Sequence, residues 1–218
     1  MEVFIDHHTH SDVKKTDISQ CADIIRIRNA SLYDISEEYP FTIGLHPYDT
    51  DLFTDDNIQK IYELAKNDNC VGIGECGIDR LHNEKHILQK EFFEKQIEIS
   101  ELLQKPLIIH LVRATNDLLE IRKRLNPKQP WIIHGFRGKM SLAQIFIDQG
   151  IYLSMGQYHN KQSLFTAYNS NSLLLETDES TMCITEIYKE ISHEIGISCE
   201  KLAYYIYKNT PFNKYISI

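Results

Sequence analysis

The chain contains short apolar runs that do not alternate with polar residues and that are separated by turn residues. Runs of this kind are typical of strands that are buried on both faces of a parallel sheet. Eight strands are predicted in this way, at Val3–Asp6, Asp23–Arg28, Phe41–Leu45, Val71–Gly74, Leu107–Ile109, Trp131–Ile133, Ile151–Ser154 and Leu173–Glu176.

Between the later strands, apolar residues recur at helical spacing, which predicts amphipathic helices. The longest is expected from about Glu84 to Gln104, and the segment MCITEIYKEI also has a helical pattern. Ser198 is a favourable N-cap, so a last helix is expected from there to Asn209. Shorter helices are expected around Ile58–Ala65, Leu118–Leu125 and Leu142–Phe146.

Alternating strands and helices with eight strands predict an α/β fold, a (β/α)8 TIM-type barrel. The connections Ser11–Ala22 and Asn29–Pro40 are too short or too polar for full helices, so one or two outer helices should be reduced. A length of 218 residues fits one such trimmed domain, covering residues 1–218. An open doubly wound sheet is the alternative, but no glycine-rich phosphate loop follows any strand.

Metal-binding side chains follow the predicted strands with unusual regularity. Six of the eight strands end beside such a residue, and in a barrel these strand ends meet at the rim where active sites lie. The residues are, in chain order, His8 and His10, His46, Glu75, His110, His134 and Asp178.

Without His46, which is considered separately below, four imidazoles and two carboxylates remain. They are more ligands than one tetrahedral ion needs, and they suit a two-metal centre with a bridging carboxylate. We expect Glu75 to bridge two divalent ions. His8, His10 and Asp178 would hold one ion, and His110 and His134 the other. A metal-activated hydroxide would attack a phosphorus or carbonyl centre, with Asp178 as proton acceptor. The donor set is compatible with Zn, Mn, Ni, Fe or Mg.

The composition restricts the substrates and the cellular location that are expected for this chemistry. The net charge of −8 disfavours a large duplex-DNA footprint, although bound cations can reverse the sign inside a pocket. No apolar run approaches the roughly 18 residues of a membrane span, and MEVFID enters a strand without a signal core. A cytoplasmic location without membrane contact is therefore predicted. The five scattered cysteines are expected to be reduced.

The motifs HTHSD, GLHPYD, GIGECGID, PLIIH, HGFRG, YLSMG and LLLETD occur in this order along the chain. In this respect the sequence resembles the TatD-like metal-dependent hydrolases, from Asp6 to the C-terminal KLAYYIYKNTPF. The resemblance implies a TIM-type barrel, two divalent metal ions and phosphodiester hydrolysis, described as deoxyribonuclease activity. DNA ends or short oligonucleotides would be substrates. The implied ligands are His8, His10, Glu75, His110, His134 and Asp178.

The sequence departs from the family pattern at the positions expected to meet substrate. Tyr48 stands where the family usually has the last histidine of GxHPH, and Arg113 lies one residue beyond the usual arginine. Arg137 replaces a small serine, and the usual basic, proline-containing loop after the eighth strand is expected to be missing, because MCITEIYKEI has a helical pattern. Arg113 and Arg137 are predicted as phosphate contacts. His46 is expected to touch substrate or to orient a ligand, and the alternative is that it only caps its strand.

Two other functions are compatible with the same ligands. The first is an amidohydrolase-like enzyme or a small-phosphoester hydrolase on the same barrel. His110 stands where a carboxylated lysine would be expected in such a relative, which favours the phosphodiesterase. The second is a metal-binding protein without turnover, and the complete ligand set argues against it.

Overall fold

The computed structural model describes residues 3–10, 23–35, 39–81 and 85–216. The chain forms two compact units, one of Met1–Arg28 with His134–Ile218 and the other of Asn29–Ile133. No helix in the described part of the chain combines the length and the apolar content that a bilayer crossing requires.

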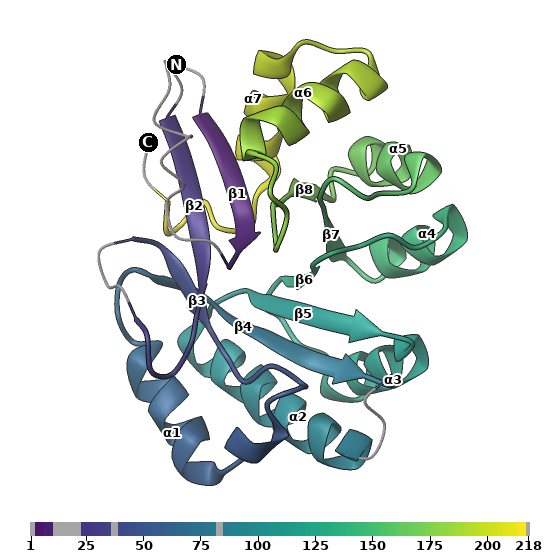
Figure 1. The fold of residues 1–218 in the computed structure, drawn as a ribbon. Helices are drawn as coiled ribbons and strands as arrows, with labels where there is room; N and C mark the ends of the chain where they lie inside the picture. The colour runs from purple at the N-terminus through teal and green to yellow at the C-terminus, as the bar shows by residue number, and fades with distance from the viewer. Residues whose placement is uncertain (1–2, 11–22, 36–38, 82–84, 217–218) are drawn as a thin grey trace. The chain divides into compact units, whose positions relative to one another are not determined.

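Strands and helices alternate along the described residues, and the strands are ordered as in the sequence, from β1 to β8 (Figure 1). This topology confirms the predicted fold class, a TIM-type α/β barrel. The strands are β1 (Val3–Thr9), β2 (Asp23–Ala30), β3 (Phe41–Ile43), β4 (Cys70–Asp79), β5 (Leu107–Val112), β6 (Trp131–Ile133), β7 (Ile151–Met155) and β8 (Leu173–Leu175). The helices are α1 (Asp55–Leu64), α2 (His86–Leu103), α3 (Thr115–Leu125), α4 (Met140–Asp148), α5 (Lys161–Asn169), α6 (Ile184–Ile195) and α7 (Cys199–Asn209).

The first unit contains the N-terminal and the C-terminal parts of the chain. Strand β1 pairs in parallel with β2, β7 pairs in parallel with β8, and a bridge between Thr9 and Asp178 links β1 to the segment after β8. Helices α6 and α7 pack against β1, where the Tyr188 hydroxyl accepts from the Ile5 amide at 3.2 Å and donates to its carbonyl at 3.1 Å. A side chain thus satisfies backbone groups of β1.

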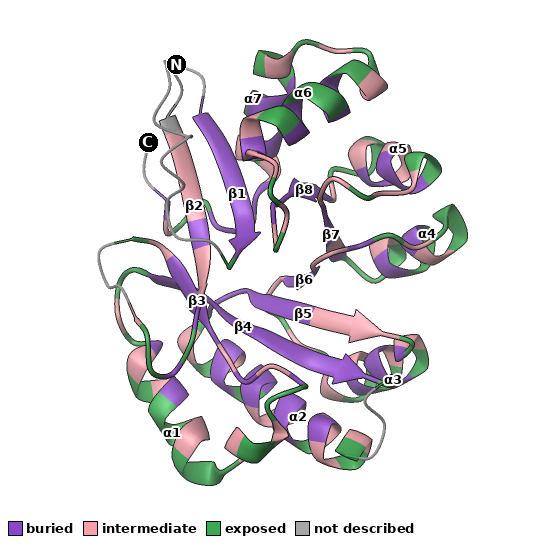
Figure 2. Ribbon diagram, in the orientation of Figure 1, coloured by how far each residue is buried: buried purple, intermediate pink, exposed green. Residues whose placement is uncertain are grey.

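The second unit has a parallel sheet in which β4 pairs with β3 and β5, and β5 pairs with β6. All ten residues of β4 are buried, while α1 and α2 expose their outer sides (Figure 2). Helix α2 packs along β4, and Phe93 on its inner side meets Trp131 edge to face. The continuous apolar character of β4 reflects burial on both faces.

The predicted helices are confirmed, including α7, where the Ser198 side chain accepts from the Lys201 amide. Helix α6 begins at Ile184, within the segment expected to be helical. The connection before β3 contains no helix in its described residues, 29–35 and 39–40, as expected. The connection Ser11–Ala22 lies outside the described residues.

Two features differ from the prediction. Strands β1, β4 and β5 extend beyond the predicted ends, where residues of the metal-binding motifs continue the backbone pairing. Strand β2 is also longer than predicted, and β3 and β8 are shorter. Helix α5 was not predicted. Its buried positions are Ser163, Leu164 and Ala167, so only one large apolar side chain marks its inner face. The Asn160 side chain caps it by accepting from the Ser163 amide.

Candidate metal centre

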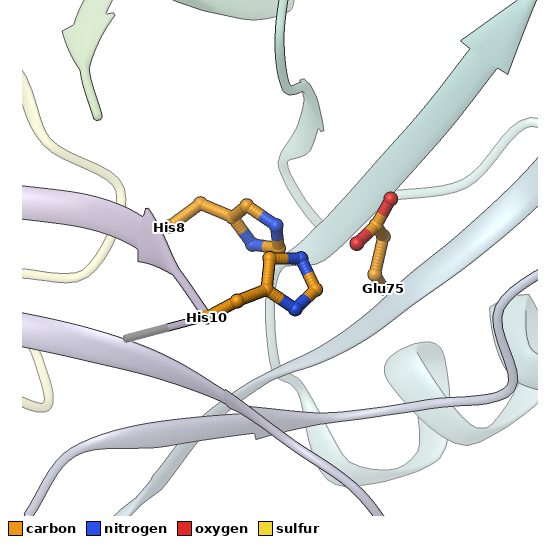
Figure 3. A group of neighbouring side chains, drawn as sticks. All are labelled: His8, His10 and Glu75. Atoms are coloured by element: carbon orange, nitrogen blue, oxygen red, sulfur yellow. The ribbon is translucent and has the colours of Figure 1, made fainter. Parts of the chain in front are cut away.

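The first unit gathers three metal-binding side chains from distant parts of the sequence. Ligand atoms of His8, His134 and Asp178 all lie within 4.8 Å of one another. The rings of His8 and His134 are 4.3 Å apart, and His8 Nε2 lies 3.8 Å from Asp178 Oδ1. His10 Nε2 is 3.6 Å from the same oxygen. Figure 3 shows the imidazoles of His8 and His10 beside each other at the end of β1.

An irregularity in β1 helps to position these groups. The register with β2 runs from Asp6 opposite Arg26 to Thr9 opposite Arg28, so β1 contains one extra residue, as in a β-bulge. The extra residue ends the strict alternation of side-chain directions along β1. Beyond it, the Asp178 amide donates to the His8 carbonyl at 2.9 Å, which fixes Asp178 beside the strand.

Two buried carboxylates support this group. Glu176 accepts from the Gly135 amide, and its Oε1 lies 3.7 Å from His134 Nδ1. Burial acts to raise the pKa of Glu176, but the His134 side chain holds this pKa below its ordinary value. Asp6 accepts from the amide and the hydroxyl of Thr177 at 2.9 and 2.7 Å, and burial raises the pKa of Asp6 to about 7. Both therefore brace the segments that carry His134 and Asp178.

The second unit brings together His46, Glu75 and His110, whose ligand atoms also lie within 4.8 Å of one another. Glu75 projects from β4 (Figure 3), and its Oε1 lies 2.9 Å from His110 Nδ1 and 3.1 Å from His46 Nε2. The Asn29 side chain makes two hydrogen bonds to Glu75: it accepts from the Glu75 amide at 3.0 Å and donates to Glu75 Oε2 at 3.4 Å.

Close approach of two strands sets the position of His110. Gly77 on β4 pairs with His110 on β5, and its φ of 142° lies in a region that L side chains rarely adopt. A Cβ at residue 77 would overlap the carbonyl oxygen of His110. The third glycine of GIGECGID is therefore required by the packing of β4 on β5.

Hydrogen bonds determine which ring nitrogens can face a cation. The Tyr48 amide donates to His46 Nδ1 at 3.2 Å, so His46 Nε2 carries the hydrogen and acts as a donor. His110 Nε2 lies 3.0 Å from Asp79 Oδ2. Burial acts to raise the pKa of Asp79, but hydrogen bonds from His110 and Tyr48 hold this pKa below its ordinary value. His110 therefore donates through Nε2.

The remaining lone pair of His110 is on Nδ1, which faces the Glu75 carboxylate. In the neutral imidazole this Nδ1 lies 2.9 Å from Glu75 Oε1 and 3.2 Å from the donor His46 Nε2, and a cation can bind it together with the carboxylate. The chemistry of the donor set thus fits a divalent metal, and the mixture of imidazole and carboxylate suits a transition metal.

The predicted ligands therefore fall into two groups. His8, His10, His134 and Asp178 are in the first unit, and Glu75 and His110 are in the second, together with His46. Which side chains share an ion stays a prediction. The predicted phosphate contacts Arg113 and Arg137 are both exposed.

Sequence reasoning missed two partners of the predicted ligands, Asn29 and Glu176. Glu176 lies two residues before Asp178 in LLLETD, and this position was assigned to the end of a strand. Asn29 stands in a strand without any motif around it. Of these two partners, only Glu176 could have been recognised from the sequence, because it is an acidic residue at the end of an apolar run.

A family model described as "TatD related DNase" matches residues 5–211 of the chain. The chain is similar to an uncharacterized metal-dependent hydrolase of Bacillus subtilis, YabD, with 32% identity over 157 residues that cover 66% of this chain and 61% of that protein. It is 28% identical to the deoxyribonuclease Tat-D of Schizosaccharomyces pombe over 160 residues, 65% of this chain and 51% of that protein.

A 3'-5' ssDNA/RNA exonuclease TatD of Klebsiella pneumoniae is 30% identical over 146 residues, which cover 63% of this chain and 56% of that protein. The matched part of the chain thus spans between half and two thirds of the length of these curated relatives.

Two solved structures have the same fold. The TatD homologue YJJV from Escherichia coli matches with a TM-score of 0.80 and 19% identity, covering 96% of both chains. A hydrolase TatD family protein from Entamoeba histolytica matches with a TM-score of 0.75 and 15% identity, covering 98% of both chains. At these identities the likeness concerns the fold, and it agrees with the TIM-type topology.

Proposed function

The chain belongs to the TatD-related DNase family of metal-dependent hydrolases, and on this basis we propose that it cleaves phosphodiester bonds in DNA ends or short oligonucleotides. The relatives from Schizosaccharomyces pombe and Klebsiella pneumoniae, which are named as nucleases, support this substrate class. The observation that carries the proposal is the convergence, in each unit, of histidine and carboxylate ligand atoms within 4.8 Å.

The proposed centre would hold two divalent ions, and Glu75 is the carboxylate that they would share. The other ligands are His8, His10, His110, His134 and Asp178. Support for a single centre comes from the order of the family motifs and from the fold, because carboxyl ends of strands face one rim in a TIM-type barrel. The donor types favour Zn, Mn, Ni or Fe over Mg, which prefers oxygen ligands.

When bound, the ions would lower the pKa of a water molecule towards about 7 and neutralise charge on the phosphoryl group. Asp178 is the proposed acceptor of the proton from that water. Its backbone is held against β1 by the His8 carbonyl, and Asp6 braces the preceding residue. These contacts hold the backbone from which the Asp178 carboxylate projects.

His46 has a different proposed role from the metal ligands. Because its Nδ1 accepts from the Tyr48 amide, its Nε2 presents a hydrogen, and this nitrogen lies 3.1 Å from Glu75 Oε1 and 3.2 Å from His110 Nδ1. A donor at this position orients the bridging carboxylate, and it can also bind an oxygen of the substrate. We therefore propose that His46 contacts substrate and is not a metal ligand.

Exposed cationic side chains are the proposed phosphate contacts. Arg113 follows β5, and Arg137 lies three residues beyond His134. The guanidinium carbon of Arg137 is 5.4 Å from the centre of the Tyr158 ring, which is 64% exposed. A guanidinium can bind a phosphate while an exposed aromatic ring stacks on an unpaired base. Arg137 and Tyr158 together therefore suit a single-stranded substrate.

The proposal is tested with bis(4-nitrophenyl) phosphate and with end-labelled single-stranded oligonucleotides, after loading the protein with Mn²⁺ or Zn²⁺. We expect hydrolysis that stops with chelator and that falls by at least about 100-fold in Asp178→Asn. Asp148→Asn, an exposed aspartate on α4 in the same unit, is the matched control. Hydrolysis of amides or lactones without any phosphodiester cleavage would refute the proposal.

A further inference from the structure

Tyr48 makes a hydrogen bond that connects it to a proposed metal ligand. Its hydroxyl donates to Asp79 Oδ2 at 2.8 Å, and the same oxygen lies 3.0 Å from His110 Nε2. Asp79 is completely buried, whereas the Tyr48 side chain is half exposed. The tyrosine therefore reaches from the surface to the carboxylate that holds the far side of the His110 ring.

The segments that carry Tyr48 and Asp79 are fixed to each other. Gln89 on α2 accepts from the Asp79 amide at 3.0 Å and donates to the Pro47 carbonyl at 2.9 Å. Asp79 Oδ1 also accepts from the Leu81 amide at 2.7 Å. Gln89 is buried, so this bridge is protected from water. The separation of Tyr48 and Asp79 is thus built into the packing and does not depend on their own contact.

Without the hydroxyl, the carboxylate would lose one of the donors that set its orientation. The oxygen that receives the Tyr48 hydroxyl is the one that faces His110, so a rotation of the carboxylate would weaken the His110 contact directly. Partners of this kind orient a ligating imidazole and raise its basicity.

We propose that Tyr48 is a positioning residue, which acts through Asp79 to hold His110 with Nδ1 directed at Glu75 and at the metal. This inference rests on the proposed metal centre. It assigns a role to a residue at which this chain departs from the usual GxHPH pattern. The tyrosine takes part in orienting a ligand, and it does not itself bind the ion.

The test measures binding of Co²⁺ to the full chain, by competition with a chromophoric chelator and by the visible absorption of the bound ion. Tyr48→Phe should weaken binding by about 3- to 10-fold, the loss of one hydrogen bond to a charged network. Asp79→Asn should weaken it by about 10- to 100-fold. The matched control is Tyr39→Phe, since Tyr39 is 50% exposed and Tyr48 is 48% exposed.

The double variant decides whether Tyr48 acts through Asp79. If it does, Tyr48→Phe combined with Asp79→Asn binds Co²⁺ no more weakly than Asp79→Asn alone, because the carboxylate through which the hydroxyl acts is already gone. The Co²⁺ spectrum of Tyr48→Phe should also differ from that of the wild type, since the His110 ring is reoriented. A folded state is verified for every variant by circular dichroism.

Three results would overturn the inference. The first is that Tyr48→Phe equals Tyr39→Phe in affinity and spectrum. The second is that the effect of Tyr48→Phe adds fully to that of Asp79→Asn, which would mean that Tyr48 has an independent role such as direct substrate contact. If the wild-type chain binds no Co²⁺, the proposed centre falls together with the inference. Wild-type binding with an unaffected Tyr48→Phe refutes the role of Tyr48 alone.

Discussion

Replacement of Glu176 by glutamine tests whether the first group of ligands is braced as the structure indicates. The substitution keeps the size of the side chain and an oxygen for the Gly135 amide, but it removes the negative charge beside His134. Glu176 is fully buried, and its Oε1 lies 3.7 Å from His134 Nδ1. A carboxylate in this place favours the tautomer of His134 that directs Nε2 towards a metal.

The expected loss can be worked from this geometry. Removal of a carboxylate that supports a ligating histidine costs about 10- to 100-fold in metal affinity. This corresponds to about 1.4 to 2.7 kcal/mol of binding free energy. The free energy of unfolding without metal should change much less, because the hydrogen bond to Gly135 persists and no cavity is created. The predicted signature is thus weaker metal binding in a protein of nearly unchanged stability.

The assay is a chelator competition with Zn²⁺ on wild type, Glu176→Gln and the exposed control Glu190→Gln, with urea unfolding of each apoprotein. Equal metal affinity in all three proteins would refute the reasoning, because the carboxylate would then have no influence on His134. A large drop in stability of Glu176→Gln would also contradict it, by showing that Glu176 acts through the fold.

Three further predictions concern the fold. Gly77→Ala should lower the free energy of unfolding by at least about 1 to 3 kcal/mol in urea titrations, since it combines backbone strain with a clash on the His110 carbonyl. Tyr188→Phe should cost about 1 to 3 kcal/mol in the same assay, because it leaves backbone groups of Ile5 without their partner. Hydrogen bonds from Arg80 and Lys90 hold the pKa of Asp117 below its ordinary value. The stabilising effect of the Asp117 carboxylate should therefore be present above about pH 4 and disappear as the pH falls through the folded pKa. Urea midpoints of wild type and Asp117→Asn should therefore differ at pH 7 and converge in acid; a constant difference would contradict this.

The strands were predictable because each is an apolar run bounded by turn residues, and burial on both faces leaves that pattern in the sequence. Helix α5 was not, because its inner face is made largely of small residues and its cap depends on Asn160 meeting the Ser163 amide. The ends of β1 and β4 were also misjudged, since polar motif residues continue the backbone pairing there.

The candidate ligands could be named from the sequence because they follow apolar runs, and parallel strands of a barrel present those ends at one rim. The sequence alone thus determined the fold class, the family and the residue types available for a metal. Only the tertiary structure decided their partners. The contacts of Asn29 with Glu75 and of Glu176 with His134 depend on strand register, a bulge and loop paths, which arise from packing between segments far apart in the chain.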